Sequence, residues 1–235
     1  MSDVSLKGRR VAVTGGFGVL GRAVCALLLE RGAKVAALDK ANRPDDAFFA
    51  KCSVAIGGVD LGVPESAAEA ISSAVHELGG LDCLVNVAGG FDWELVGSGS
   101  IETWDRMYNM NLRTAVIASQ SALPALKESG PGGCIVNIGS LSAQKAARGA
   151  GAYAASKSGV ARLTEALAEE LKADQITVNA VLPSVIDTPG NRESMPKADT
   201  SRWVLPRDLA AVVAFLLSAD ARSITGALLP VAGKV

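Results

Sequence analysis

The segment Arg10–Glu30, RVAVTGGFGVLGRAVCALLLE, decides the fold of this chain. Its first five residues form an apolar run that predicts a buried strand, and residues 22–30 have the apolar spacing of a helix. Between them stands a glycine-rich turn, Thr14–Gly21. Glycines between a strand and a helix let the backbone approach a pyrophosphate at the helix N-terminus, because they have no Cβ atom. The segment therefore predicts a site for a dinucleotide.

A second strand-like run, Lys34–Leu38, indicates which dinucleotide binds. It ends at Asp39, which follows Gly21 by the roughly 20 residues expected of this motif. A carboxylate here accepts hydrogen bonds from ribose hydroxyls and repels a 2′-phosphate. The pattern favours NAD(H), while Lys40 and Arg43 leave NADP(H) open. The alternative is a turn that only joins strand to helix, with Asp39 at the surface.

Tyr153 and Lys157 form a candidate pair for proton transfer. They stand four residues apart at the head of a predicted helix that continues through Ala173, so both side chains lie on one face. A nearby ammonium favours the phenolate and lowers the pKa of a tyrosine from its usual ~10. Ser140 follows the strand-like run Cys134–Ile138, where its hydroxyl can bond a substrate oxygen beside the phenol. The alternative is a chance pair on an exposed helix.

Together, the glycine turn and the Tyr153-x-x-x-Lys157 pair resemble the short-chain dehydrogenase/reductase family, nearly from end to end of the chain. The resemblance implies hydride transfer between a nicotinamide dinucleotide and a small carbonyl or alcohol substrate. It implies that Tyr153 exchanges the proton, Lys157 lowers its pKa and holds the ribose, and Ser140 orients the reacting oxygen. Asn111 would hold a water that links Lys157 to solvent; a buried capping or kinking asparagine is the alternative.

The resemblance also implies contacts around the rest of the cofactor. Asp60 and Leu61 would meet the adenine, although Asp60 can instead cap the helix predicted over Pro64–Leu78. Asn86 would stabilise the central sheet beside the ribose, and the loop that begins at Pro183 would hold the nicotinamide. The residues expected to contact the cofactor are Gly15, Gly16, Phe17, Gly18, Val19, Leu20, Gly21, Asp39, Lys40, Asp60, Leu61, Asn86, Ala88, Gly89, Tyr153, Lys157, Pro183, Ile186 and Thr188.

Two departures from the family pattern suggest a second function. Val19 stands where the family usually has a glycine, and Gly18 comes one place earlier. This spacing and the short stretch 187–203 resemble the dihydropteridine reductase branch, which implies NADH-dependent reduction of a quinonoid dihydropteridine. Those reductases generally have no serine at the place of Ser140. A cofactor-sensing protein without turnover is the non-enzymatic alternative, but dinucleotide binding alone does not require Ser140.

The loop 91–100 is a candidate substrate contact, because it follows the fourth predicted strand at the edge where α/β sheets bind ligands. A planar ligand can stack on its Trp93. The alternative is a tryptophan that packs on a neighbouring loop.

The composition excludes several other classes of function. The chain has 235 residues with 23 Lys+Arg against 24 Asp+Glu, which gives a net charge of −1. It therefore lacks the excess of positive charge that binds nucleic acid or an anionic membrane. No run approaches the ~18 apolar residues that span a bilayer, and we expect a cytoplasmic protein. Four cysteines without C-x-x-C spacing and a single histidine, His76, predict buried thiols and no metal site.

Strand-like and helix-like segments alternate along the whole chain. This predicts one doubly wound α/β Rossmann domain over 1–235, with a mostly parallel seven-stranded sheet and helices on both faces. The third strand is expected within 53–61 and a long helix over 101–127. The resemblance implies that this helix and the one through 161–173 form the interface of a homotetramer or homodimer.

Overall fold

All of the strands expected from the sequence join one sheet in the computed structural model, which describes residues 4–234. Within these residues, seven strands pair in the order β3-β2-β1-β4-β5-β6-β7, and every pair is parallel. The doubly wound α/β fold is confirmed, and the sheet is wholly parallel. Residues 1–3 and 235 of the predicted domain lie outside the described part. The strands are Arg10–Thr14 (β1), Lys34–Leu38 (β2), Val54–Ile56 (β3), Cys83–Asn86 (β4), Cys134–Ile138 (β5), Thr177–Pro183 (β6) and Leu228–Val231 (β7).

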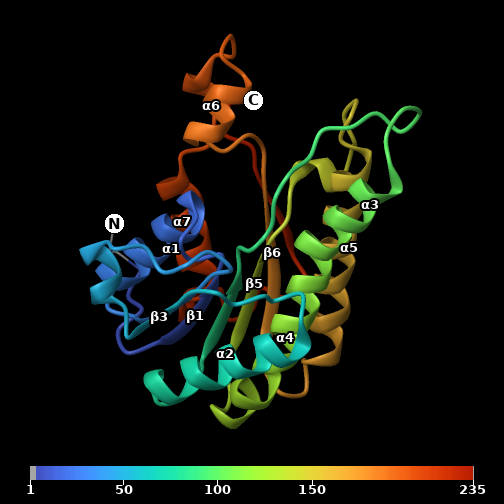
Figure 1. Cartoon of the computed structure of the whole chain (residues 1–235). Coiled ribbons are helices and arrows are strands. Elements are labelled where there is room, and N and C mark those ends of the chain that lie inside the picture. The colour runs from blue at the N-terminus through green and yellow to red at the C-terminus, as the bar shows by residue number, and fades with distance from the viewer. Residues whose placement is uncertain (1–3, 235) are drawn as a thin grey trace.

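Helices cover both faces of this sheet (Figure 1). α1 and α7 pack on one face, and α2, α4 and α5 pack on the other. The segment around α6 and the loop before α3 rise beyond the sheet at its carboxyl edge. The α-helices are Val19–Glu30 (α1), Pro64–Leu78 (α2), Ile101–Met107 (α3), Thr114–Glu128 (α4), Gly151–Glu170 (α5), Pro189–Ser194 (α6) and Pro206–Leu216 (α7).

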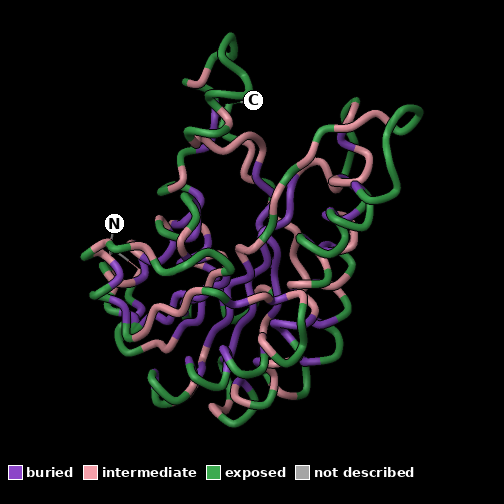
Figure 2. Tube along the Cα trace, viewed as in Figure 1, coloured by how far each residue is buried: buried purple, intermediate pink, exposed green. Residues whose placement is uncertain are grey.

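The core follows from the alternation of side chains along each strand. Val13 and Val136 face the layer of α1 and α7, whereas Leu84 and Ile135 face the layer of α2, α4 and α5. Both sets are fully buried, because helices cover both faces of a parallel sheet. Figure 2 shows this buried centre and the exposed segments that surround it.

Two elements differ from the prediction. β3 covers only Val54–Ile56, because the chain bends at Gly58, which has φ +75°. The long helix over 101–127 is continuous but contains a π-helical segment, Tyr108–Arg113, between α3 and α4. A π turn holds one extra residue and re-aims the side chains that follow it.

Several predicted absences can be examined in the described part of the chain. No helix among residues 4–234 is long and apolar enough to cross a membrane. No cluster of three or more potential metal ligands occurs among the same residues. The four cysteines are free and buried, and His76 is exposed on α2, as expected.

Candidate active site

One large cleft, of about 2200 Å³, lies at the carboxyl edge of the sheet. It is lined by residues that directly follow the strands, including Gly15 after β1, Asp39 after β2, Val87 after β4 and Gly139 after β5. The order of the strands reverses between β1 and β4, and the carboxyl ends at such a reversal form the usual ligand crevice of an open α/β sheet.

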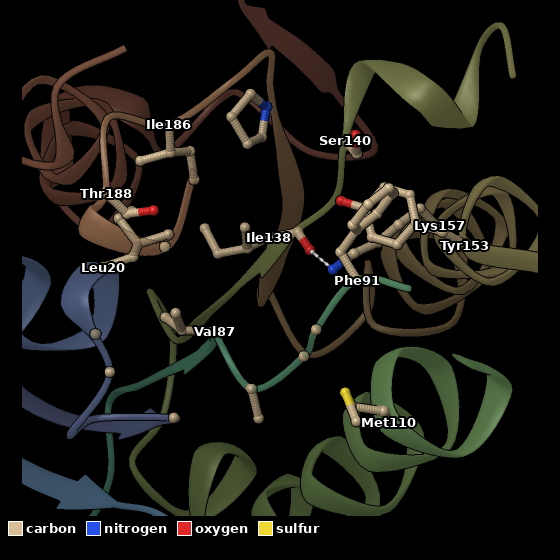
Figure 3. Close-up of a pocket in the computed structure, with 18 of the residues that line it drawn as sticks. Leu20, Val87, Phe91, Met110, Ile138, Ser140, Tyr153, Lys157, Ile186 and Thr188 are labelled. Atoms are coloured by element: carbon tan, nitrogen blue, oxygen red, sulfur yellow. Dashed lines mark hydrogen bonds between the residues drawn. The ribbon is translucent and has the colours of Figure 1, made fainter. Parts of the chain in front are cut away.

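Most of the predicted site residues line this cleft (Figure 3). Three do not: Gly16, Asn86 and Asn111 lie behind its wall. The predicted residues that do line it are Gly15, Phe17, Gly18, Val19, Leu20, Gly21, Asp39, Lys40, Asp60, Leu61, Ala88, Gly89, Ser140, Tyr153, Lys157, Pro183, Ile186 and Thr188.

The glycine turn owes its shape to three of its glycines. Gly15 has φ +62°, and a Cβ atom there would lie 2.8 Å from the amide nitrogen of Ala88. A Cβ on Gly16 would lie 2.9 Å from that of Ala37, and one on Gly21 would overlap the carbonyl of Gly15. A Cβ on Gly18 would meet only that carbonyl, at 3.5 Å. The chain itself therefore requires glycine at 15, 16 and 21, but not at 18.

This turn fits the pyrophosphate of a dinucleotide. Gly18 is the N-cap of α1 and offers no side-chain acceptor, so no side chain caps the first amide groups of the helix. Those groups and the positive end of the helix dipole favour an anion, and the glycines leave room for it. The exposed backbone around Gly18 is the part of the turn that a phosphate can approach.

Asp39 is held at the mouth of the cleft by backbone amides. Its Oδ2 accepts a hydrogen bond from Phe17 N at 3.0 Å, and its Oδ1 accepts one from Ala41 N at 2.9 Å. The carboxylate is therefore fixed beside the glycine turn and keeps lone pairs for further donors. The role of Asp39 toward a ribose stays a prediction.

Lys40 and Asp60 form an ion pair beside it, with Nζ and Oδ2 2.8 Å apart. The hydrogen bond from Lys40 lowers the pKa of Asp60, and the amide of Gly62 donates to the same carboxylate. The N-cap of α2 is Val63, so the alternative role of Asp60 as the cap of that helix is wrong.

Buried hydrogen bonds fix the floor of the cleft. Thr14 Oγ1 accepts hydrogen bonds from Val87 N at 3.1 Å and Ala88 N at 3.2 Å, which ties the end of β4 to β1. Asn86 Nδ2 donates to Asn137 Oδ1 at 2.9 Å and so joins β4 to β5 below the cleft. Asn86 therefore supports the sheet, as expected, and its neighbour Thr14 has a similar role that was not predicted.

Asn111 lies in the π-helical segment and is 1% exposed. Its Oδ1 accepts a hydrogen bond from Gly90 N at 3.0 Å, and its Nδ2 donates to Gly90 O and to Ser156 Oγ, both at 3.1 Å. Ser156 Oγ in turn donates to Tyr153 O at 2.7 Å. Asn111 thus joins the segment after β4 to the first turns of α5, which carry the candidate catalytic pair.

Lys157 points into the cleft from α5. Its Nζ donates to Ile138 O at 2.8 Å, as Figure 3 shows, and lies 6.0 Å from the centre of the Tyr153 ring. The residue is only 5% exposed. Burial disfavours the charged ammonium and lowers its pKa from 10.5 to about 8. Lys157 therefore changes charge close to neutral pH.

Tyr153 and Ser140 interact directly. Burial raises the pKa of the Tyr153 phenol above its usual 10, and the hydrogen bond with Ser140 partly offsets this. Ser140 Oγ accepts a hydrogen bond from Ser142 N at 3.1 Å, so its own proton is available to the phenol oxygen. Burial therefore dominates the pKa of Tyr153 in the protein without a cofactor, and the lowering of that pKa by Lys157 stays a prediction.

Two aromatic side chains of the loop 91–100 complete this end of the cleft. The ring of Phe91 meets that of Tyr153 edge to face, with centroids 5.0 Å apart and planes at 81°. Trp93 packs on Gly149, where any Cβ atom would overlap the indole, and Glu94 N donates to Gly149 O at 2.8 Å. Trp93 therefore packs on a neighbouring loop and also lines the cleft. Phe91 belongs to the loop 91–100 that the sequence marks as a candidate substrate contact, but nothing in its spacing links it to Tyr153.

The loop after β6 closes the cleft opposite Tyr153 (Figure 3). Thr188 Oγ1 caps α6 by accepting a hydrogen bond from Asn191 N at 3.2 Å, which leaves its proton free for another acceptor. Asn191 Nδ2 donates to Ile186 O at 2.8 Å and fixes the loop. Asn191 was also missed, although the Thr-Pro pair before it is a typical helix start.

The cleft has a glycine turn that fits a pyrophosphate at one end and a phenol beside a buried amine at the other. These two features together define a class of protein. The layout is that of an oxidoreductase which binds a nicotinamide dinucleotide across the carboxyl edge of a parallel sheet.

Comparison with known proteins gives the family. The model of the short chain dehydrogenases matches residues 9–199, and the chain belongs to this family of oxidoreductases. D-xylose 1-dehydrogenase of Caulobacter vibrioides is 33% identical over 232 residues, which cover 94% of this chain and 93% of that protein. Aldohexose dehydrogenase of Thermoplasma acidophilum, solved in ligand-free form, superimposes with a TM-score of 0.86 at 31% identity, covering 96% of this chain and 93% of that one. A short chain dehydrogenase of Burkholderia cenocepacia, solved in complex with NADP, gives 0.84 at 31% identity, covering 97% and 98%.

Proposed function

We propose that this chain is an NAD-dependent dehydrogenase/reductase that interconverts a small alcohol and its carbonyl compound by means of Ser140, Tyr153 and Lys157. The observation that carries the proposal is the arrangement of these three side chains. The Ser140 hydroxyl bonds the phenol of Tyr153 at the end of the cleft that lies away from the glycine turn, and the buried Lys157 lies beside it.

The chain's own residues fit the cofactor in order along the cleft. The glycine turn takes the pyrophosphate, Asp39 takes the adenosine ribose, and Asp60 with Leu61 lies where the adenine belongs. Pro183, Ile186 and Thr188 belong to the nicotinamide end, beside Ala88 and Gly89. When bound, the nicotinamide dinucleotide supplies or accepts the hydride.

Asp39 supports the preference for NAD over NADP. Its fixed carboxylate accepts ribose hydroxyls and repels a 2′-phosphate. The nearby cation, Lys40, is already paired with Asp60, and Arg43 does not line the cleft. The NADP complex of the Burkholderia relative makes NADP the alternative cofactor. Titration of the protein with NADH and NADPH, followed by cofactor fluorescence, decides between them, and we expect the tighter Kd for NADH.

Proton transfer at Tyr153 completes the reaction. In the reductive direction the phenol donates its proton to the substrate oxygen, and its raised pKa keeps it protonated at neutral pH. Below pH 8 the ammonium of Lys157 stabilises the phenolate that forms. The Ser140 hydroxyl orients the substrate oxygen. In the oxidative direction the same phenolate takes the proton of the alcohol.

Asn111 acts as a positioning residue in this proposal. Its side chain bonds Gly90, which lines the cleft, and Ser156 and Met107, which do not. It fixes the first turns of α5 and hence Tyr153. The water-mediated link from Lys157 to solvent stays a prediction.

Substitution of Tyr153 by Phe tests the proposal. The ring contact with Phe91 is kept and only the hydroxyl is lost. We expect kcat to fall at least about a hundredfold, the size of a lost general acid, while the Kd for NADH changes less than about twofold. Tyr108→Phe is the matched control, because it removes the same hydroxyl from an exposed residue. Full turnover by the Tyr153→Phe protein would refute the assignment.

The expected homodimer or homotetramer is also a proposal. α3 and the π-helical segment expose Ile101, Trp104 and Tyr108, and a shallow groove between α4 and α5 is lined by Leu123 and Leu163. These apolar surfaces suit burial against a second copy. Light scattering coupled to gel filtration measures the mass directly, and a monomer at micromolar concentration would contradict the proposal.

A further inference from the structure

Positive charge gathers at the Tyr153 end of the cleft. Lys145 and Arg148 line it from the segment between Ser140 and α5, and both are exposed. Within residues 4–234, neither side chain forms an ion pair, in contrast to the lining residue Arg106, which pairs with Asp92 at 2.6 Å. Two cations therefore face this space without an internal counter-charge.

The carboxylates around the cleft do not balance them. Among the lining residues that the structure describes, the acidic ones are Asp39 and Asp60, which lie at the β2 end of the cleft. Asp39 accepts hydrogen bonds from backbone amides, and Asp60 forms an ion pair with Lys40. Asp187, near the opposite wall, makes two hydrogen bonds with the guanidinium of Arg192. Glu94, which follows Trp93, accepts a hydrogen bond from Ser100 N at 3.0 Å. The charge at this end is therefore a net excess of cations.

The same end has apolar walls. Phe91 and Trp93 line the cleft and are 55% and 59% exposed. Trp93 is held on Gly149, directly next to Arg148 in the chain. An apolar wall that adjoins a cation suits a ligand with an apolar body and an anionic end.

From these observations, and resting on the proposed function, we propose that the substrate carries an anionic group, a carboxylate or a phosphate, that Lys145 and Arg148 bind. Phe91 and Trp93 contact its apolar body, while its carbonyl or alcohol faces Tyr153. The cofactor's own phosphates belong at the glycine turn before α1, across the cleft from the segment 141–150 that precedes α5 (Figure 1). Lys145 and Arg148 are therefore specificity-determining residues for the substrate.

Binding of small aromatic probes tests this without requiring turnover. Isothermal calorimetry at low salt, with and without NAD⁺, compares benzoate and phenyl phosphate with neutral benzamide. We expect the better of the two anions to bind about tenfold more tightly than benzamide, because it pairs with two exposed cations. The difference shrinks as salt screens the charges. The two anions show whether the site prefers a carboxylate or a phosphate.

Two double variants locate the effect. Lys145→Gln with Arg148→Gln removes both cations, and we expect the anion to lose its advantage while benzamide binds as before. Lys7→Gln with Lys34→Gln removes the same charge from exposed residues that do not line the cleft, and we expect no change. Equal affinities for anions and benzamide, no measurable binding of any probe, or equal losses in both double variants would overturn the proposal.

The turnover of two matched aldehydes, one charged and one neutral, distinguishes a failure of this proposal from a failure of the proposed function. NADH-dependent reduction of 4-formylbenzoate and of its methyl ester is measured in the same variants. We expect Lys145→Gln with Arg148→Gln to raise KM about tenfold for the acid only. If neither aldehyde is reduced but benzoate binding depends on the two cations, the proposed reaction fails and the anion site stands. If both are reduced equally well by all variants, the anion site fails and the reaction stands.

Discussion

Replacement of Lys157 by Met should change how the stability of the protein depends on pH. The burial of Lys157 lowers its pKa from 10.5 to about 8 in the folded state, whereas the unfolded chain keeps the ordinary value. Below the folded pKa the lysine is charged in both states, so folding carries the full cost of burying the ammonium. A difference of this size corresponds to about 3 kcal/mol.

The sign of the effect follows from proton binding. Between pH 8 and 10.5 the unfolded chain binds more protons than the folded protein, so stability rises with pH as this cost disappears. Methionine at 157 does not titrate. The wild type should therefore gain about 1.3 kcal/mol of unfolding free energy relative to Lys157→Met between pH 7 and pH 9. The loss of the hydrogen bond to Ile138 displaces the Lys157→Met stability curve by a constant amount, so the difference in slope between the two curves is unchanged.

Urea unfolding of the cofactor-free protein at a series of pH values measures this difference. Tyr153→Phe is the control, because the raised pKa of Tyr153 places its titration above this range, and its curve should run parallel to that of the wild type. Parallel curves for wild type and Lys157→Met would refute the account of Lys157 as a desolvated ammonium.

Three further substitutions test other parts of the site. Gly21→Ala places a methyl group against the backbone of the glycine turn and should weaken NADH binding at least about tenfold. Gly18→Ala should fold normally and weaken NADH binding less. Fluorescence titration measures the binding of NADH, and thermal melting measures the stability of each variant. Asp39→Asn should raise the KM for NADH and lower the KM for NADPH, as measured by steady-state kinetics with both cofactors. An unchanged ratio of the two KM values would contradict this. Asn111→Ala should cost about 1–3 kcal/mol of stability, measured by urea unfolding, because it leaves the amide groups of Gly90 without partners; an unchanged stability would contradict its structural role.

Much of the fold could be predicted because its signals are local. Arg10–Thr14, Lys34–Leu38 and Cys134–Ile138 are apolar runs, and each forms a strand with those bounds. Pro64–Leu78 begins with a proline at its first turn and ends at Gly79, which has φ +74°, so both ends of α2 were marked in the sequence.

The features that could not be predicted arise from contacts between distant segments. The π-helical segment Tyr108–Arg113 keeps ordinary helical spacing in the sequence, and its Asn111 bonds Gly90, which lies 21 residues away in the chain. The pairing of Tyr153 with Lys157 follows from their spacing, but the pKa of Tyr153 depends on its burial and on Ser140, which spacing does not reveal.

Direct titration of Tyr153 tests the central claim, that its phenol exchanges a proton beside a bound dinucleotide. The chain has two tyrosines, so Tyr108→Phe leaves Tyr153 as its single phenol, and absorbance at 295 nm then reports its ionisation alone. We expect a midpoint above pH 10 for the free protein, and a clearly lower midpoint with saturating NAD⁺, because a cationic nicotinamide in the same cleft favours the phenolate. The same midpoint with and without NAD⁺ would contradict the account.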